Sequence, residues 1–143
     1  MRNSRGFSLL ELLIVVAIIL IIATIAIPSL LRSRQAANET AAVATLKQLN
    51  TAEVTYSSAS QNVYGSLPDL VAAGLLDSSL TTTKAGYNYN VELSADLRNY
   101  TASATAVTSM QGRFDYYTAP DYVIRYSTDS TRAPSTLAGE PVR

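Results

Sequence analysis

An uninterrupted apolar stretch near the N-terminus constrains this chain more than any other feature. Across residues 9–27 every side chain is apolar except Glu11 and Thr24. As an α-helix, residues 7–27 extend about 31 Å at about 1.5 Å per residue, which matches the roughly 30 Å hydrocarbon core of a bilayer. The apolar residues lie on all sides of that helix, whereas the core helix of a soluble domain carries one apolar stripe. The stretch therefore predicts a membrane-spanning helix.

A cleavable secretory signal is the main competing interpretation of this stretch. Arg2 and Arg5 form a basic start, and Ala23 and Ala26 are small residues late in the apolar run. A typical signal has an apolar region of about 7–15 residues followed by a polar cleavage site. Here the run is longer and continues past Ala26 into helix-compatible sequence, which favours a retained helix.

Glu11 is the exceptional residue of the apolar stretch. A carboxylate inside a membrane costs on the order of 2.5–3.5 kcal/mol, yet no Lys or Arg occurs between positions 6 and 31. Cleavage between Gly6 and Phe7 would create an α-amine one helical turn before Glu11. Pairing of this amine with Glu11, within one chain or between chains, would lower the cost of burying both charges. The alternative is a Glu11 side chain that snorkels to the membrane surface.

The residues around this point resemble a known family. Positions 5–12 read Arg-Gly-Phe-Ser-Leu-Leu-Glu-Leu, which is similar to the class III signal of type IV pilins and pseudopilins. The resemblance implies that a membrane prepilin peptidase cleaves after Gly6 and methylates the new N-terminal Phe7. It also implies a role of Glu11 in subunit assembly and a proline near the end of the apolar run. Pro28 stands there, and it predicts a helix kink because proline lacks the N–H donor and clashes with the preceding turn.

The second half of the predicted helix is amphipathic. Ala42, Leu46, Leu49, Ala52 and Tyr56 are spaced as one helical face, so we expect this stripe to cover a globular partner. The opposite side is predicted to carry polar residues: Asn38, Glu39, Lys47, Gln48 and Asn50.

The rest of the chain predicts a small sheet. Residues 66–74 have a capping Ser, an early Pro and a closing Gly, which indicate a short helix. Alternating polarity predicts strands over 87–93 and 100–106, and two further short strands are expected at 113–118 and 122–128. The expected fold is α+β, a long kinked helix packed on an antiparallel sheet of about four strands, similar to the ladle of pilins. The expected organisation is a cleaved leader (1–6), a transmembrane and filament-core helix (7–28), an amphipathic helix (29–60), a globular head (61–128) and a polar tail (129–143).

The composition of the chain excludes most classes of catalytic and binding site. The chain has no Cys, His or Trp, so thiol nucleophiles, imidazole bases and disulfides are absent, including the loop-closing disulfide of better-known pilins. We therefore expect no enzyme activity, catalytic residue, cofactor or metal. Asp115, Asp121 and Asp129 do not have the spacing of a compact calcium loop. Beyond residue 34, seven Lys and Arg face ten Asp and Glu, and this net charge of −3 disfavours nucleic acid as a partner of the head.

The nine tyrosines, all between Tyr56 and Tyr126, admit two interpretations. They could form an adhesive or electron-carrying surface, or they could be ordinary strand residues that bury a ring and leave the hydroxyl in water. Regular alternation along the expected strands favours the second interpretation.

The expected function is a structural subunit of a type IV pilus, of the major type. The resemblance implies self-association into a homopolymeric filament, with the prepilin peptidase, an assembly ATPase and an inner-membrane platform as partners. It implies a precursor in the bacterial inner membrane and a final place in a surface filament. Two alternatives within the same class are a pseudopilin of a type II secretion system and a minor pilin that acts as a receptor in adhesion or DNA uptake.

Overall fold

The described residues form one long helix, two short helical segments and a small sheet. A computed structural model describes residues 6–127 and 139–142. In order, its elements are α1 (Leu9–Ala59), α2 (Leu67–Ala72), the 3₁₀ helix η1 (Ser78–Thr81), β1 (Tyr87–Leu93), β2 (Tyr100–Ala106), β3 (Tyr116–Thr118), β4 (Arg125–Tyr126) and β5 (Glu140–Pro141). The chain divides into two compact units, one ending at Arg34 and one beginning at Gln35, so that α1 contributes to both.

Helix α1 is 51 residues long and includes Pro28 without a break in the helix. In its first part, Leu, Ile and Val have high or moderate helix propensity, and neither glycine nor a run of turn-forming residues interrupts them. Because Pro28 has no backbone N–H, the carbonyl of Thr24 lacks its usual helical partner. Separately, the Thr24 hydroxyl donates to the Ile21 carbonyl, one turn earlier in the helix, at 2.7 Å.

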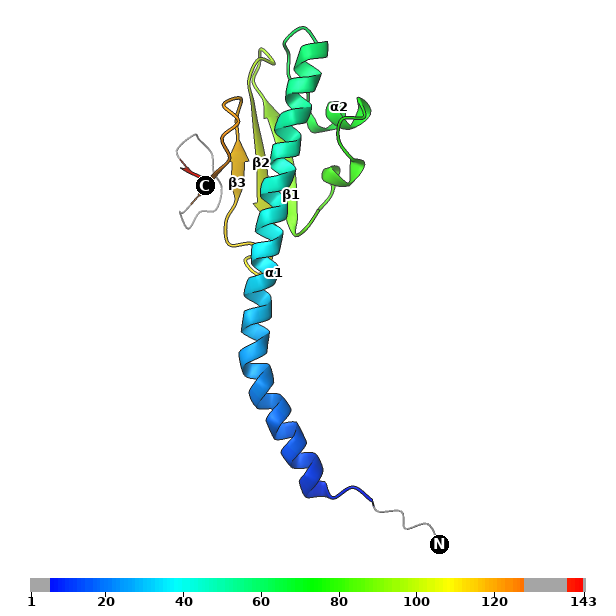
Figure 1. Cartoon of the computed structure of the whole chain (residues 1–143). Coiled ribbons are helices and arrows are strands. Elements are labelled where there is room, and N and C mark those ends of the chain that lie inside the picture. Colours follow the sequence, from blue (N-terminus) through cyan, green and yellow to red (C-terminus); the bar gives the residue numbers. More distant parts are fainter. Residues whose placement is uncertain (1–5, 128–138, 143) are drawn as a thin grey trace. The chain divides into compact units, whose positions relative to one another are not determined.

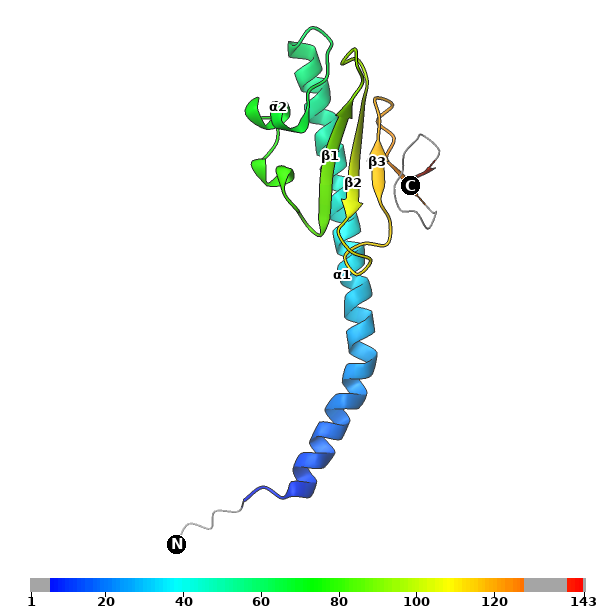
Figure 2. The same ribbon diagram turned by 180° about the vertical axis from the view of Figure 1, so that it is seen from behind.

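The second unit is built on an antiparallel meander in the strand order β1-β2-β3-β4-β5. Strands β1 and β2 pair along their whole length, from Tyr87 opposite Ala106 to Leu93 opposite Tyr100. Figures 1 and 2 show, from opposite sides, that the C-terminal half of α1 lies along one face of β1–β3, while α2 lies beside it. One layer of helix therefore covers one layer of sheet.

The core of this unit lies between α1 and the sheet. From α1 it contains Ala42, Leu46 and Leu49, which are fully buried and belong to the predicted stripe. The sheet contributes alternate residues, namely Tyr87, Tyr89, Val91, Tyr100, Ala102, Ala104 and Tyr116. Their neighbours Asn88, Asn90 and Glu92 are exposed, so the alternation predicted for the first two strands is confirmed.

The edge of the sheet differs from the expectation. The sheet has five strands and not about four, because Glu140 and Pro141 pair with Tyr126 and Arg125. These two residues lie in the segment that the sequence assigned to a polar tail; residues 129–138 and 143 of that segment lie outside the described residues. The two strands expected at 113–118 and 122–128 are shorter, at Tyr116–Thr118 and Arg125–Tyr126. The second cannot begin at Tyr122, because the backbone φ of this residue is 60°, outside the range of strand residues.

The polar side of α1 also differs from the expectation. Glu39 and Asn50 were placed on the solvent side, but they are 7% and 6% exposed. Tyr56, expected in the buried stripe, is only half-buried, and its ring lies so close to Gly65 that a Cβ there would come within 3.0 Å of it. The sheet covers a wider sector of the helix than the apolar stripe alone, so flanking polar residues are buried with it.

Candidate processing and assembly site

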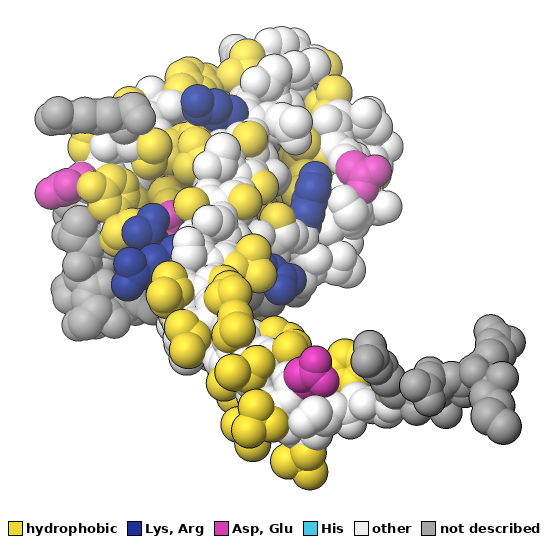
Figure 3. All heavy atoms as spheres, turned by 60° about the horizontal axis from the view of Figure 1, so that its bottom comes forward, with side chains coloured by type: hydrophobic (Ala, Val, Ile, Leu, Met, Phe, Trp, Pro, Cys, Tyr) yellow, Lys and Arg dark blue, Asp and Glu magenta, His cyan; other side chains and the backbone are white. Residues whose placement is uncertain are grey.

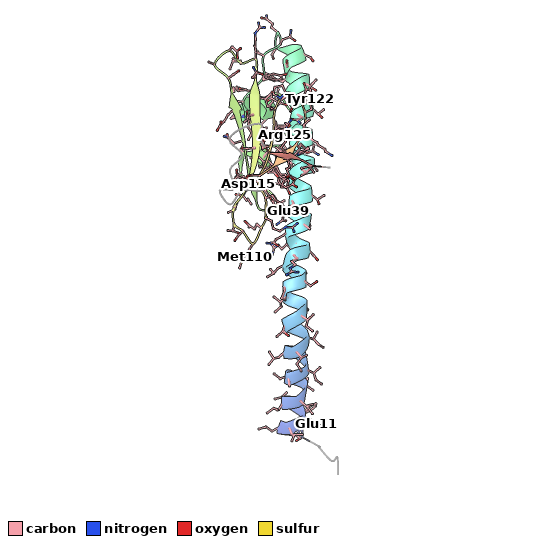
Figure 4. All side chains as sticks on the ribbon, turned by 90° about the vertical axis from the view of Figure 1, so that its left-hand side faces the viewer. Glu11, Glu39, Met110, Asp115, Tyr122 and Arg125 are labelled. Atoms are coloured by element: carbon pink, nitrogen blue, oxygen red, sulfur yellow. The ribbon has the colours of Figure 1, made fainter. Side chains whose placement is uncertain are left out.

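The start of α1 is organised by a reciprocal pair of hydrogen bonds between Ser8 and the first turn. The Ser8 backbone N–H donates to Glu11 Oε2 at 3.2 Å, and Ser8 Oγ accepts from the Leu10 N–H at 3.3 Å. This arrangement resembles a capping box, in which two donors at the helix start are satisfied by side chains. The sequence interpretation missed it, although the Ser-x-x-Glu spacing is its usual signature. Figure 4 shows Glu11 at this N-terminal end of α1.

Gly6 and Phe7 lie before the helix in non-helical chain. The Phe7 side chain is 81% exposed, and a Cβ placed on Gly6 would meet no heavy atom within 4 Å. The fold of this chain therefore does not itself require glycine at position 6. Since Glu11 accepts a bond from Ser8, its carboxylate reaches the residue directly after Phe7.

The helix beyond Glu11 exposes almost all of its apolar side chains. Figure 3 shows hydrophobic side chains covering the visible face of this segment. One shallow groove of about 400 Å³ is lined by Leu9, Leu12, Leu13, Val16, Ala17 and Leu20, with the small Ala17 on the same helical face as the larger side chains. The helix is long and apolar enough to cross a membrane, and none of its most apolar stretch is buried within the protein. Such a surface is not stable in water and needs lipid or other apolar helices around it.

A second polar cluster connects α1 to the loop between β2 and β3. Gln35 donates to the Ser109 carbonyl, and Asn38 donates to the Gln111 carbonyl, each at 2.8 Å. One turn further, the Glu39 carboxylate accepts from the Arg113 N–H at 2.8 Å and from its guanidinium at 2.8 and 3.0 Å. Residues 35, 38 and 39 share one side of the helix, so α1 holds this loop along its length.

Polar groups are also buried between α1 and the sheet. The Asn50 side chain donates to the Thr118 hydroxyl at 2.9 Å and accepts from the Tyr100 hydroxyl at 2.8 Å. Both tyrosines at the start of β1 and β2 are buried with bonded hydroxyls, since Tyr87 donates to the Phe114 carbonyl. The rings are buried, as the second interpretation of their pattern predicted, but these two hydroxyls bond to other protein groups and not to water.

Glu53 is a fully buried acid on α1. Its Oε2 accepts from the Gly65 N–H at 3.1 Å, whereas its Oε1 has no hydrogen-bond partner among the described residues. Burial raises the pKa of Glu53 to about 7, with a smaller contribution from the charge of Asp69, while the bond from Gly65 opposes the shift. The sequence pattern does not distinguish Glu53, because a buried Glu beside an apolar stripe has the same spacing as an exposed one.

Two of the acidic residues considered for calcium, Asp115 and Asp121, bond to separate partners in the described part of the chain. Asp115 is buried and accepts from the Ala106 N–H, and Asp121 pairs with Arg125. Hydrogen bonding to Arg125 holds the pKa of Asp121 below its usual value. Asp129 lies outside the described residues.

Comparison with known proteins agrees with the geometry of the N-terminal segment. Residues 1–27 match the family model described as the prokaryotic N-terminal methylation motif. Over 100 residues, covering 70% of this chain and 72% of the relative, the sequence is 38% identical to the type IV wide pilus major component PilA4 of Thermus thermophilus. The chain therefore belongs to the type IV pilin family, and it is a pilin-type structural subunit with a long-helix α+β fold.

Proposed function

We propose that the chain is a major subunit of a type IV pilus and is processed between Gly6 and Phe7. The observation that carries the proposal is the conjunction of a methylation motif over residues 1–27 with an exposed, non-helical Gly6-Phe7 bond directly before α1. A protease needs accessible, non-helical chain, and this bond offers both. Because a Cβ at position 6 would meet no heavy atom within 4 Å, a requirement for glycine there would belong to the peptidase pocket.

The relative supports the major type of subunit. Its name identifies it as the major component of a wide pilus. A pseudopilin of type II secretion and a receptor-type minor pilin would share the N-terminal motif but not that abundance in a filament. A self-associating, homopolymeric filament is therefore favoured.

Removal of the leader would give Glu11 a charged partner for subunit assembly. The new α-amine at Phe7 lies four residues before Glu11 along the chain. If the helices of neighbouring copies run parallel, an amine of one copy meets Glu11 of the next when the helices are displaced by four residues, or about 6 Å. Neutralisation of both charges would favour this one displacement over others, because each charge alone is costly among apolar helices.

The exposed apolar part of α1 is suited to two successive environments. Before assembly, lipid would surround it in the bacterial inner membrane; after assembly, the same side chains would pack against equivalent helices in a filament outside the cell. A kink at Pro28 would assist this packing. Extraction from the membrane needs work that this structural subunit does not supply, so we propose an assembly ATPase and an inner-membrane platform as partners, together with the prepilin peptidase.

Mass spectrometry of filaments sheared from cells tests the proposal. We expect the protein as the most abundant filament component, with an N-terminus that begins at methylated Phe7. A chain that begins at Met1, or after Ala26, would overturn the processing step. Filaments that contain the chain only in trace amounts would overturn the assignment as major subunit.

A further inference from the structure

The buried acid Glu53 binds the connection between α1 and α2. Figure 1 shows this connection, residues 60–66, as it leaves the end of α1 and turns back to α2. The Glu53 side chain is 0% exposed, and its Oε2 accepts from the Gly65 N–H at 3.1 Å. Its Oε1 is also buried and has no hydrogen-bond partner in the described part of the chain. The backbone of the connection is thus the one described hydrogen-bond partner of this carboxyl group.

A small number of other contacts ties the connection to the globular unit. The Tyr64 N–H donates to the Leu97 carbonyl at 2.8 Å, and the Tyr64 ring meets Tyr100 edge to face with centroids 4.7 Å apart. Just before this point, Gln61 and Asn62 have backbone φ values of 55° and 63°. This left-handed region is unfavourable for residues other than glycine. Segments of this kind open locally at a lower free energy than strands that are paired along their length.

The titratable groups around Glu53 supply no positive charge. The described groups that interact with Glu53 or with its tyrosine neighbours are acidic or neutral: Asp69 of α2, Tyr64 of the connection, Tyr100 of β2, and Asp121 and Tyr122 between β3 and β4. Asp121 is itself paired with Arg125. An ionised Glu53 would therefore be a buried anion without a counterion, and burial accordingly raises the pKa of Glu53 to about 7.

Water is the remaining source of stabilisation for an ionised Glu53. Ionisation strengthens the bond from the Gly65 N–H but leaves Oε1 as a charged acceptor without a donor. Water reaches this oxygen only if a covering segment moves. Helix α1 and strand β2 are held by helical and ladder hydrogen bonds, whereas the connection is held by the contacts above. The connection is therefore the part that moves most easily.

We propose that Glu53 and the Gly65 N–H form a proton-controlled latch. The neutral carboxyl group keeps residues 60–66 closed over α1, and loss of its proton opens this connection to water. Because the connection leads directly into α2, the latch makes the surface around α2 more ordered in acid than at neutral pH.

The direction of the pH dependence follows from the proton affinity of the two states. The pKa of Glu53 is about 7 in the closed state and returns toward the ordinary 4.5 once water reaches the carboxyl group. Between these values the closed state binds more protons. The population of the open connection therefore rises about tenfold per pH unit, by on the order of a few hundred-fold in total, and is constant outside this range.

Amide hydrogen exchange of the detergent-solubilised full chain, followed by NMR, tests the latch. Exchange rates divided by the intrinsic rate at each pH give the protection of each amide. We expect the protection of the Tyr64 and Gly65 amides to fall about tenfold per unit between about pH 5 and 7. Global unfolding also exposes Glu53, so the amides of the β1–β2 ladder can show the same slope. Local opening is distinguished by a protection at least several-fold lower for Tyr64 and Gly65 than for the ladder.

A matched pair of variants assigns the slope to Glu53. Glu53→Gln keeps an acceptor for the Gly65 N–H but cannot ionise, so the slope at the Tyr64 and Gly65 amides should disappear. Glu92→Gln makes the same change at an exposed acid of β1 and should retain it. Equal protection of the two amides and the ladder at every pH would overturn the latch, as would a protection in the wild type that does not change with pH. A wild-type slope in Glu53→Gln would overturn it as well.

Discussion

The carboxylate of Glu39 and the guanidinium of Arg113 join two parts of the chain that are 74 residues apart in sequence. Glu39 accepts one hydrogen bond from the Arg113 backbone and two from its side chain. The Glu39 side chain is 9% exposed, whereas that of Arg113 is 57% exposed. The pair therefore satisfies a buried acid with a cation that remains largely hydrated, and it fixes the β2–β3 loop against α1.

Arg113→Ala should destabilise the folded chain by about 1–3 kcal/mol, because Glu39 loses both guanidinium bonds while it stays buried. The loss is smaller than for a fully buried pair, since water screens the exposed arginine. Thermal unfolding of the detergent-solubilised full chain measures the effect. Arg98→Ala removes an exposed arginine that forms no ion pair with another described residue, and it should change stability by less than about 0.5 kcal/mol. Equal stability of the two variants would contradict the structural role of the pair.

The same pair shows how far the sequence predicts this fold. Local periodicity identified α1, the short helix and the first two strands, because each of these elements has an apolar pattern of its own. The burial of Glu39 depends on Arg113, and the strand at Glu140 depends on Tyr126 and Arg125; these partners are distant in sequence and leave no local pattern. At the N-terminus the motif around Gly6, Phe7 and Glu11 was readable because all of its residues lie close together in sequence.

Glu53 should make the stability of the head depend on pH. Its pKa of about 7 in the folded chain exceeds the ordinary value of 4.5, so the folded state binds more protons between these two values. Stability therefore falls as pH rises from about 4.5 to 7, by on the order of 3 kcal/mol at most, and then levels off. Glu53→Gln keeps an acceptor for the Gly65 N–H but cannot ionise. The difference in melting temperature between this variant and the wild type should grow across that pH range, and a constant difference would refute the role of Glu53.

Gly112→Ala should destabilise the head by about 1–3 kcal/mol through overpacking. A Cβ at position 112 would collide with the hydroxyl end of Tyr87, whose ring is fully buried and whose hydroxyl is bonded to the Phe114 carbonyl. Adding Tyr87→Phe removes the colliding oxygen, so the double variant should lose less stability than the sum of the two single changes. Chemical denaturation of the four proteins measures this coupling; strict additivity would show that the collision is relieved in another way.

Gly6→Val should block leader removal, while Gly6→Ala should retain part of it. A Cβ at position 6 meets no heavy atom within 4 Å, so a defect reports on recognition by the peptidase and not on folding. Immunoblots of membranes should show accumulation of the longer precursor with Gly6→Val. Normal cleavage of that variant would mean that position 6 is not part of the recognised sequence.

The carboxylate of Glu11 has two roles that three substitutions separate. It caps the first turn by accepting the Ser8 N–H, and we propose that it also neutralises the α-amine of a neighbouring Phe7. Glu11→Ala removes the cap and the charge, Glu11→Gln keeps an acceptor but removes the charge, and Ser8→Ala removes the bond to the Leu10 N–H but keeps the charge.

If charge neutralisation drives assembly, both Glu11 variants should be cleaved normally yet yield few filaments, while Ser8→Ala should assemble. Loss of one cap costs only about 0.5–2 kcal/mol of helix stability, and neighbouring helices in a filament compensate for it. An unpaired charge among apolar helices is more costly, and no neighbouring apolar side chain compensates for it. Filament yield normalised to processed subunit distinguishes the two roles. Normal assembly of Glu11→Gln would show that the charge of Glu11 is not needed for assembly, and capping would remain as the function of this residue.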